Sequence, residues 1–309
     1  MNPSAEKPRW YESAVRMERI ASHIQDAATV PFMEACALPV DEVAEIDERY
    51  HDAEADTYDA YSDIPRIREA EKWIVPWIRD AARPGLIIDL GTGTGRVAAQ
   101  IQGPSRQVIA VDRSKHMLAA AQRRLDPSCS VVLRADARDL PLHDASVDTV
   151  ICSGVLHHIP SWPDVVREMG RILKPQGVLI VREPNADYPA GLFEPLESLL
   201  SWVARRTQRT ARQTGAATAP DGAAPVETLS PVEAPIALAD LVKAATSAGL
   251  RRQTVGSVKF LASLGIPDEM PGQQLYFVPA NLVDRAAHAL TGHRYGSLIL
   301  STFVKEERI

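Results

Sequence analysis

The side chains best suited to chemistry in this chain are acids and glycines that directly follow short apolar runs. Leu86-Ile87-Ile88-Asp89-Leu90 leads into Gly91-Thr92-Gly93-Thr94-Gly95, with glycine at every second position. Each glycine allows a positive φ angle and lets a ligand approach the backbone amides, which a Cβ would hinder. The pattern therefore predicts a buried strand that ends in a ligand-binding turn.

The spacing of these glycines argues against a dinucleotide-binding turn. That turn has the pattern G-x-G-x-x-G, and aligning it on Gly91 and Gly93 places Arg96 at the third glycine. Asp89 would also repel a pyrophosphate, whereas it suits a ligand that carries an ammonium group. A nicotinamide-dependent reductase remains an alternative that the spacing does not favour.

Two more apolar runs also end in an acid. Val108-Ile109-Ala110-Val111-Asp112 places a carboxylate about 20 residues after Gly91, where it can accept both hydroxyls of a ribose. Ser114 is predicted to cap the next helix, in which Met117 either contacts an adenine ring or packs on the sheet. Val131 to Asp136 forms the third run.

The order of these segments resembles the class I S-adenosylmethionine (SAM)-dependent methyltransferases. Their first motif is hydrophobic-hydrophobic-D-x-G-x-G-x-G, as in residues 87–95. Residues 135–150 resemble the family pattern A-D-A-x-x-L-P-F-x-D-x-S-F-D-x-V. Residues 171–181 resemble R-x-L-K-P-G-G-x-L-x-I, with Gln176 in place of the first glycine. The matches run in the expected order from Leu86 to about Glu183.

The resemblance implies SAM as the cofactor and S-adenosylhomocysteine as its product. It implies that Asp136 accepts a hydrogen bond from the adenine amino group and that the Ala137 amide donates to the ring. Tyr58, in a piece like the family's A-x-x-Y-D element, would close over the methionyl end; alternatively it is a surface aromatic that packs on its own helix. The expected cofactor residues are Tyr58, Asp89, Gly91, Thr92, Gly93, Gly95, Asp112, Arg113, Met117, Asp136, Ala137 and Ser153.

Apolar runs alternate with amphipathic stretches, which predicts an α/β fold with a parallel sheet. Strands are expected at 86–90, 107–112, 130–134, 147–153, 177–183, 252–261 and 297–305, with a helix at 236–245. The resemblance implies a Rossmann-like three-layer sandwich whose seven-stranded, mostly parallel sheet has an antiparallel last strand. Ligands bind such sheets at the carboxyl ends of the strands.

Four regions are expected along the chain. Residues 1–80 form a helical extension that serves as a lid, and residues 81–185 form the SAM-binding core. Residues 186–235 hold a helical insertion and an Ala/Pro/Thr-rich linker. The arginines of that helix either lie near its C-terminus because the helix dipole favours them there, or bind a membrane surface or an anionic substrate. Residues 236–309 complete the core, with an insertion at about 263–293 that covers the acceptor or forms a homodimer contact.

A base is needed only if the acceptor is a hydroxyl or an acidic carbon, and no metal is required. His157 and His158 follow the fourth strand and are candidates for this base because histidine titrates near neutral pH. Alternatively, the pair only shapes the cofactor site. Glu183 and Tyr188 are further candidates. The N/D-P-P-Y/F sequence of nucleic-acid amino methylation is missing, since Ser153-Gly154-Val155-Leu156 stands in its place.

The composition is typical of a soluble globular protein. The 309 residues are 24% charged and 45% hydrophobic, and the net charge of −6 gives no general attraction to nucleic acid. Three cysteines indicate neither a disulfide framework nor a zinc site. With no run of about 18 apolar residues and a polar start, the chain is expected to be cytoplasmic and not inserted in a membrane.

The sequence therefore predicts a SAM-dependent methyltransferase that acts on a small, partly apolar metabolite, at oxygen or carbon rather than nitrogen. The alternative is a protein that keeps the SAM pocket but transfers no methyl group. Such a protein would serve as a binding subunit or catalyse another reaction.

Overall fold

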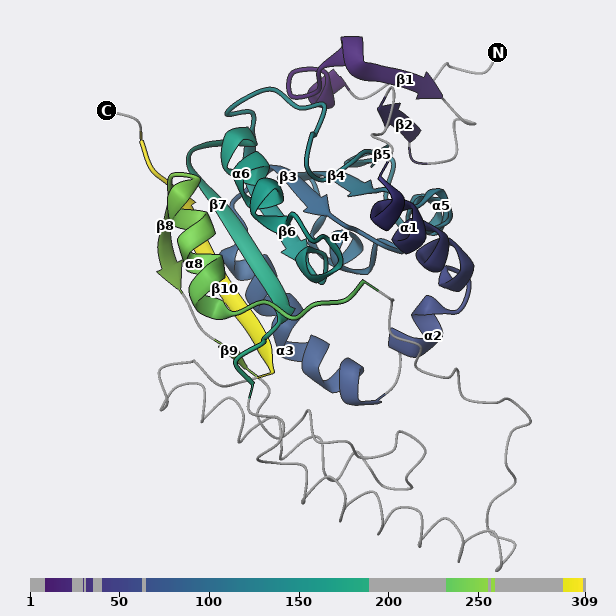
Figure 1. Cartoon of the computed structure of the whole chain (residues 1–309). Coiled ribbons are helices and arrows are strands. Elements are labelled where there is room, and N and C mark those ends of the chain that lie inside the picture. The colour runs from purple at the N-terminus through teal and green to yellow at the C-terminus, as the bar shows by residue number, and fades with distance from the viewer. Residues whose placement is uncertain are drawn as a thin grey trace, which may run out of the picture.

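A mixed β-sheet forms the middle layer of the molecule, between two layers of helices (Figure 1). The computed structural model describes residues 9–23, 30, 32–35, 41–62, 65–188, 232–254, 257–258 and 297–307. In these residues the strands lie in the order β1 (Ile20–His23), β2 (Phe32–Ala35), β5 (Ser130–Arg134), β4 (Arg106–Asp112), β3 (Gly85–Leu90), β6 (Val147–Ser153), β7 (Leu173–Pro184), β10 (Leu298–Lys305) and β8 (Leu250–Thr254), while β9 (Ser257–Val258) also pairs with β10.

The direction of the strands agrees with the predicted fold. Strands β2, β5, β4, β3, β6 and β7 are parallel to their neighbours in this order, and β10 runs antiparallel to both β7 and β8. The seven strands from β5 to β8 are the expected seven-stranded sheet with one antiparallel strand. The crossovers bring the carboxyl ends of β3, β4 and β6 to one edge.

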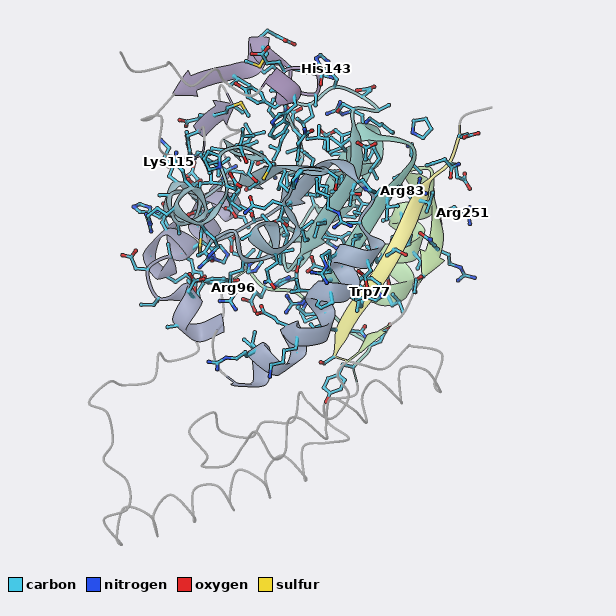
Figure 2. All side chains as sticks on the ribbon, turned by 180° about the vertical axis from the view of Figure 1, so that it is seen from behind. Trp77, Arg83, Arg96, Lys115, His143 and Arg251 are labelled. Carbon is cyan, nitrogen blue, oxygen red and sulfur yellow. The ribbon has the colours of Figure 1, made fainter. Side chains whose placement is uncertain are left out.

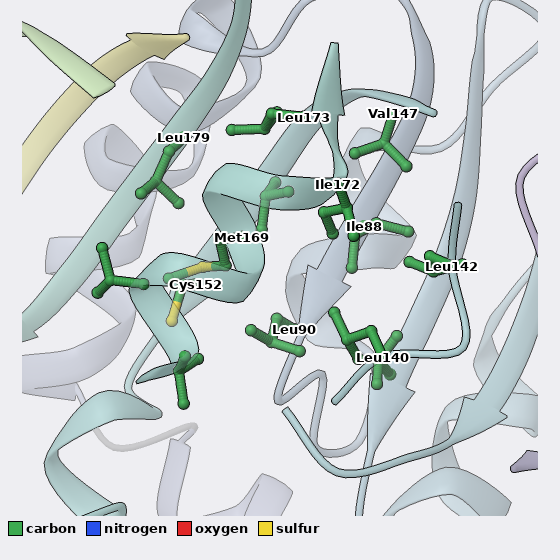
Figure 3. Packing of buried hydrophobic residues seen from close by; sticks show 14 of the residues in the cluster. Ile88, Leu90, Leu140, Leu142, Val147, Cys152, Met169, Ile172, Leu173 and Leu179 are labelled. Carbon is green, nitrogen blue, oxygen red and sulfur yellow. The ribbon is translucent and has the colours of Figure 1, made fainter. Parts of the chain in front are cut away.

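Successive side chains of the central strands point to opposite faces of the sheet and pack into two hydrophobic cores. In β3, Ile88 and Leu90 pack on the side of α6 (Trp162–Ile172) and α8 (Leu238–Ser247), whereas Ile87 packs on the opposite side. Figure 3 shows Met169 and Ile172 of α6 within the first core. These strands are buried on both faces, which explains why they read as continuous apolar runs.

The opposite face of the sheet is covered by α3 (Pro65–Ala81), α4 (Arg96–Ile101) and α5 (Lys115–Arg124). Seen from behind, Trp77 of α3 and Arg96 of α4 lie on this side (Figure 2). Pro76 lies inside α3, where Ile74 and Ile78 face the core. None of the described helices is both long and apolar enough to cross a bilayer.

The N-terminal part contains more than the expected helices. It has η1 (Arg9–Tyr11), η2 (Met17–Arg19), α1 (Glu42–Glu54) and α2 (Tyr58–Ser62), but also the β1–β2 hairpin, which extends the sheet beyond β5. The sequence pattern predicts no strands at these positions, so the hairpin is an addition to the expected fold.

The C-terminal elements fall near their expected places. Strand β7 begins at Leu173, several residues before the predicted strand, and the expected strand at 252–261 is divided into β8 and β9. The expected insertion at 263–293 and most of the one at 186–235 lie outside the described residues.

Candidate active site

A pocket lies at the carboxyl ends of β3, β4 and β6, the edge at which open α/β sheets bind ligands. Its empty volume is about 930 Å³, open solvent at the mouth included. The strand ends and the turns that follow them form one wall, α1 forms another, and η3 (Leu156–His158) lies between them. The predicted site residues that line the pocket are Tyr58, Gly91, Gly93, Asp112, Arg113, Met117, Asp136, Ala137 and His158.

The three glycines of the turn have different tasks, although all have positive φ angles of 53–79°. A Cβ on Gly91 would lie 2.2 Å from Val155, and one on Gly95 would lie 3.1 Å from Ala121 in α5. A Cβ on Gly93 would meet only Tyr58, at 3.9 Å. Gly91 and Gly95 therefore allow close packing of the protein itself, whereas Gly93 leaves open space where the pocket begins.

Asp89 lies behind the turn and is not one of the pocket-lining residues. Its side chain is buried, and its Oδ2 accepts a hydrogen bond of 2.6 Å from Thr92 Oγ1. Burial raises the pKa of Asp89 to about 6. The predicted residues Thr92 and Gly95 are likewise absent from the lining, so these three positions shape the turn in the structure.

Asp112, at the end of β4, links the glycine turn to the start of α5. Its Oδ2 accepts from the Gly93 amide at 2.8 Å and its Oδ1 accepts from the Ser114 amide at 2.9 Å. Burial raises the pKa of Asp112, against the lowering effect of these hydrogen bonds. Ser114 caps α5 as predicted, since its Oγ accepts from the Met117 amide at 3.1 Å.

Asp136 lies between two arginines. Arg113 Nη1 donates to it at 2.8 Å, and Arg138 donates to it from its backbone amide, Nε and Nη2 at 2.8–2.9 Å. Burial favours a higher pKa for Asp136, but the hydrogen bonds and charges of the arginines outweigh it and lower the pKa. An adenine amino group that reached this carboxylate would share oxygens that already accept four hydrogen bonds.

None of the α1 side chains is fully buried, and charged contacts hold the helix over the pocket. Asp41 caps the helix and pairs with Arg138. Glu48 pairs with Arg113 at 2.9 Å and with Arg134 at 2.5 Å. Asp52 accepts from Ser114 Oγ and pairs with His116 at 3.1 Å. Contacts to residues of the cofactor wall therefore position α1.

The two adjacent histidines have different surroundings in the structure. His157 Nδ1 lies 2.7 Å from Oε2 of Glu183, which is fully buried and whose Oε1 accepts from the amides of Val155 and Leu156 at 2.9 Å each. Neither His157 nor Glu183 is among the residues that line the pocket. Glu183 instead holds the loop after β6 in place.

Ser153 and Tyr188, two further predicted residues, also lie outside the pocket lining. Ser153 Oγ accepts a long hydrogen bond of 3.4 Å from Arg182. Tyr188 follows the end of β7.

His158 faces the pocket, where it meets two side chains of α1 that the sequence analysis missed. His158 Nδ1 lies 3.1 Å from Asp47 Oδ1, and the His51 ring packs edge-to-face on the His158 ring at 4.9 Å. His51 Nε2 lies 3.6 Å from Asp47 Oδ1, while His51 Nδ1 lies 2.7 Å from Glu54 Oε1. Burial favours a lower pKa for His51, but Glu54 and Asp47 outweigh it and raise the pKa. We call Asp47, His51 and His158 the α1 cluster.

A pattern in the sequence could have pointed to the α1 cluster. Asp47 and His51 are four residues apart in a stretch that forms a helix, and this spacing places both side chains on one face. The pattern does not show that this face turns toward His158.

The comparisons with known proteins agree with this geometry. Residues 88–181 match the family described as "Methyltransferase domain". The ubiquinone/menaquinone biosynthesis C-methyltransferase UbiE of Rubrivivax gelatinosus is 33% identical over 157 residues, which cover 50% of this chain and 61% of the relative. The 2-phytyl-1,4-naphtoquinone methyltransferase of Synechococcus elongatus is 36% identical over 129 residues, which cover 39% of this chain and 53% of the relative.

The chain thus spans between half and two thirds of the length of these two relatives. Among solved structures, a SAM-dependent methyltransferase of Thermotoga maritima superposes with a TM-score of 0.55 at 18% identity, covering 86% of this chain and 100% of the other. This likeness concerns the fold. The matched family and the relatives show that residues 88–181 are similar to the methyltransferase domain of SAM-dependent methyltransferases, which supports SAM as the cofactor.

Proposed function

We propose that this protein transfers the methyl group of SAM to a small, partly apolar metabolite, at an oxygen or a carbon atom. The observation that carries the proposal is the pairing of two walls in one pocket: a glycine turn with acids at the strand ends, and the α1 cluster opposite. The two relatives named above are described as quinone methyltransferases, which supports an acceptor with an apolar ring.

The residues of the cofactor wall fit a nucleoside with an amino-acid end. Each oxygen of Asp112 accepts one backbone amide and keeps a second lone-pair site, so the carboxylate can also accept the two ribose hydroxyls. Gly93 leaves space for a ligand beside Tyr58. Met117 offers an apolar surface to the base. These roles are the ones expected from the sequence for Tyr58, Asp112 and Met117.

The α1 cluster is the place where an acceptor loses its proton. SAM supplies a methyl group on a sulfonium, so transfer joins the acceptor's electron pair to the methyl carbon and returns the carbon–sulfur pair to sulfur. Asp47 and His158 offer an acid–imidazole pair at the pocket wall, with side chains 18% and 11% exposed. His157 and Glu183 lie behind this wall, so we assign them to positioning.

Two measurements test the proposal. Calorimetric titration should show binding of S-adenosylhomocysteine but not of NADH; binding of NADH alone would favour the reductase alternative. Methyl-labelled SAM, incubated with the protein and a panel of hydroxylated quinones and other small cyclic acceptors, should then yield a labelled product. Binding of S-adenosylhomocysteine with no transfer to the panel or to a cell extract would favour a SAM-pocket protein without methyl transfer.

The role of His158 has its own test. His158→Ala should lower turnover by about 100-fold or more, because proton transfer by a positioned group contributes about that much. Its affinity for S-adenosylhomocysteine should stay unchanged. The matched control is His143→Ala, which removes an exposed histidine on the loop before β6. Equal turnover in wild type and His158→Ala would remove His158 from the reaction.

A further inference from the structure

We propose that the α1 cluster binds a divalent transition-metal ion, for which Zn²⁺ suits the donors, and that this ion binds the oxygen of the methyl acceptor. The metal site itself stands on Asp47, His51 and His158 alone. The role of the ion toward an acceptor rests on the proposed function.

The distances between the donor atoms fit one ion. Asp47 Oδ1 lies 3.1 Å from His158 Nδ1 and 3.6 Å from His51 Nε2, and one donor of each residue lies within 4.8 Å of the other two. Donors about 2.0–2.1 Å from a tetrahedral zinc ion are roughly 3.3 Å apart. Small rotations of these side chains therefore bring all three into the first coordination sphere.

A second observation concerns the support of the His51 ring. His51 Nδ1 lies 2.7 Å from Glu54 Oε1 and can donate its proton there, so Nε2, which lies 3.6 Å from Asp47 Oδ1, is the nitrogen that an ion would bind in place of a proton. Histidines that ligate metals generally donate their other ring nitrogen to a carboxylate or carbonyl in this way. Glu54 thus orients the ring so that Nε2 faces the other two donors.

Two imidazoles and one carboxylate form a donor set that leaves a coordination position open. All three residues line the pocket, so a ligand in the pocket could reach an ion that they hold. With an ion bound, His158 acts as a ligand and not as the base: the cation lowers the pKa of a bound hydroxyl, whose proton passes to solvent. The oxygen then attacks the methyl carbon, and the carbon–sulfur electron pair returns to sulfur. No electron transfer is involved, which agrees with zinc.

A competing group shares one of these histidines. Among the described residues, His157, His158 and Glu233 also place three donor atoms within 4.8 Å of one another. His157 Nδ1, however, already lies 2.7 Å from the buried Glu183, and neither His157 nor Glu233 lines the pocket. The α1 cluster is therefore the one that can present an ion to a ligand. Since His158 belongs to both groups, His51 and Glu233 distinguish them.

The experiment measures metal binding without any substrate. The full chain is treated with a chelator, dialysed, and titrated with Zn²⁺ by calorimetry and with Co²⁺ by visible absorption. We expect one ion per chain and a Co²⁺ spectrum of a four- or five-coordinate site. Asp47→Asn, which keeps the side-chain shape, and His51→Gln should each weaken Zn²⁺ binding by more than about 100-fold, and Glu54→Gln by about 10- to 100-fold.

Two control variants should bind Zn²⁺ like the wild type: Glu233→Gln and His143→Ala. Every variant is also titrated with S-adenosylhomocysteine as a test of folding. Zinc affinities are compared only between variants that keep this binding. The inference is overturned if wild-type protein that binds S-adenosylhomocysteine binds no Zn²⁺, or if Glu233→Gln abolishes Zn²⁺ binding while His51→Gln does not. Loss of the proposed function would instead appear as a failure to bind S-adenosylhomocysteine or to transfer methyl, so the two failures are distinguishable.

Discussion

Glu183 offers the sharpest test of how the site is held. Replacing it with alanine removes the acceptor for the amides of Val155 and Leu156 and for His157 Nδ1. A buried donor left without a partner costs about 1–3 kcal/mol, so the two amides alone predict a loss of about 2–6 kcal/mol in the free energy of unfolding. Against a typical total of about 5–15 kcal/mol, this is a large fraction.

Glu183→Gln is the matched variant. Its carbonyl oxygen can still accept both amides, and its NH₂ group can donate to His157 Nδ1 once the ring carries its proton on Nε2. We therefore expect a loss of less than about 1.5 kcal/mol. Urea denaturation followed by circular dichroism measures both variants, and titration with S-adenosylhomocysteine reports whether the loop that ends at His158 keeps its place.

Two results would refute this reasoning. Glu183→Ala with wild-type stability would mean that the three hydrogen bonds do not form in solution. Glu183→Gln that folds and binds S-adenosylhomocysteine, yet loses about 100-fold or more of its turnover, would make Glu183 a catalytic residue, as the sequence alone had allowed.

Three further predictions concern the turn and the helix that covers the pocket. Because burial raises the pKa of Asp89 to about 6 from the usual 3.8, the folded state disfavours its charged form, and stability is lost as the pH rises from about 4 through 6. Asp89→Asn lacks this dependence, so urea denaturation should show its stability relative to wild type increasing by on the order of 2 kcal/mol between pH 4 and 7; a constant difference would contradict the assignment. Gly91→Ala should unfold at a lower temperature because its Cβ meets Val155, whereas Gly93→Ala should retain more stability but bind S-adenosylhomocysteine more weakly; the reverse order would refute the division of tasks. Glu48→Gln breaks two ion pairs of α1 and should increase hydrogen exchange of the α1 amides by about 5- to 10-fold, with the exchange of β3 as the unaffected control.

Much of the sheet could be predicted because its central strands are buried on both faces. Such strands appear as unbroken apolar runs, and the acids at their ends mark where they stop. The β1–β2 hairpin could not be found in the same way. Its strands have only four residues each, and β2 gains its place by pairing with β5, whose partner residues lie 100 positions later in the chain. Pairing of this kind depends on tertiary context more than on local propensity.

The site was predictable to a similar degree. The positions of Gly93, Asp112 and His158 at the pocket follow from the rule that ligands bind at the carboxyl ends of parallel strands. The sequence does not show that Glu183 accepts hydrogen bonds from backbone amides. The Glu183 side chain becomes buried only when β7 and the loop after β6 come together in the fold. Likewise, the contact between Asp47 and His158 joins residues 111 positions apart.

The absence of buried side chains in α1 has a consequence for how this protein can change over time. Substitutions at exposed positions away from special contacts usually alter stability by no more than about 0.5 kcal/mol. If Asp41, Glu48 and Asp52 are kept as anchors, the exposed positions of α1, among them the pocket-lining Val43, can therefore vary at little cost to folding. One wall of the pocket can adopt new chemistry while the sheet and its two cores remain as they are. Substitutions in α1 can therefore change which acceptor binds without a compensating change in the core.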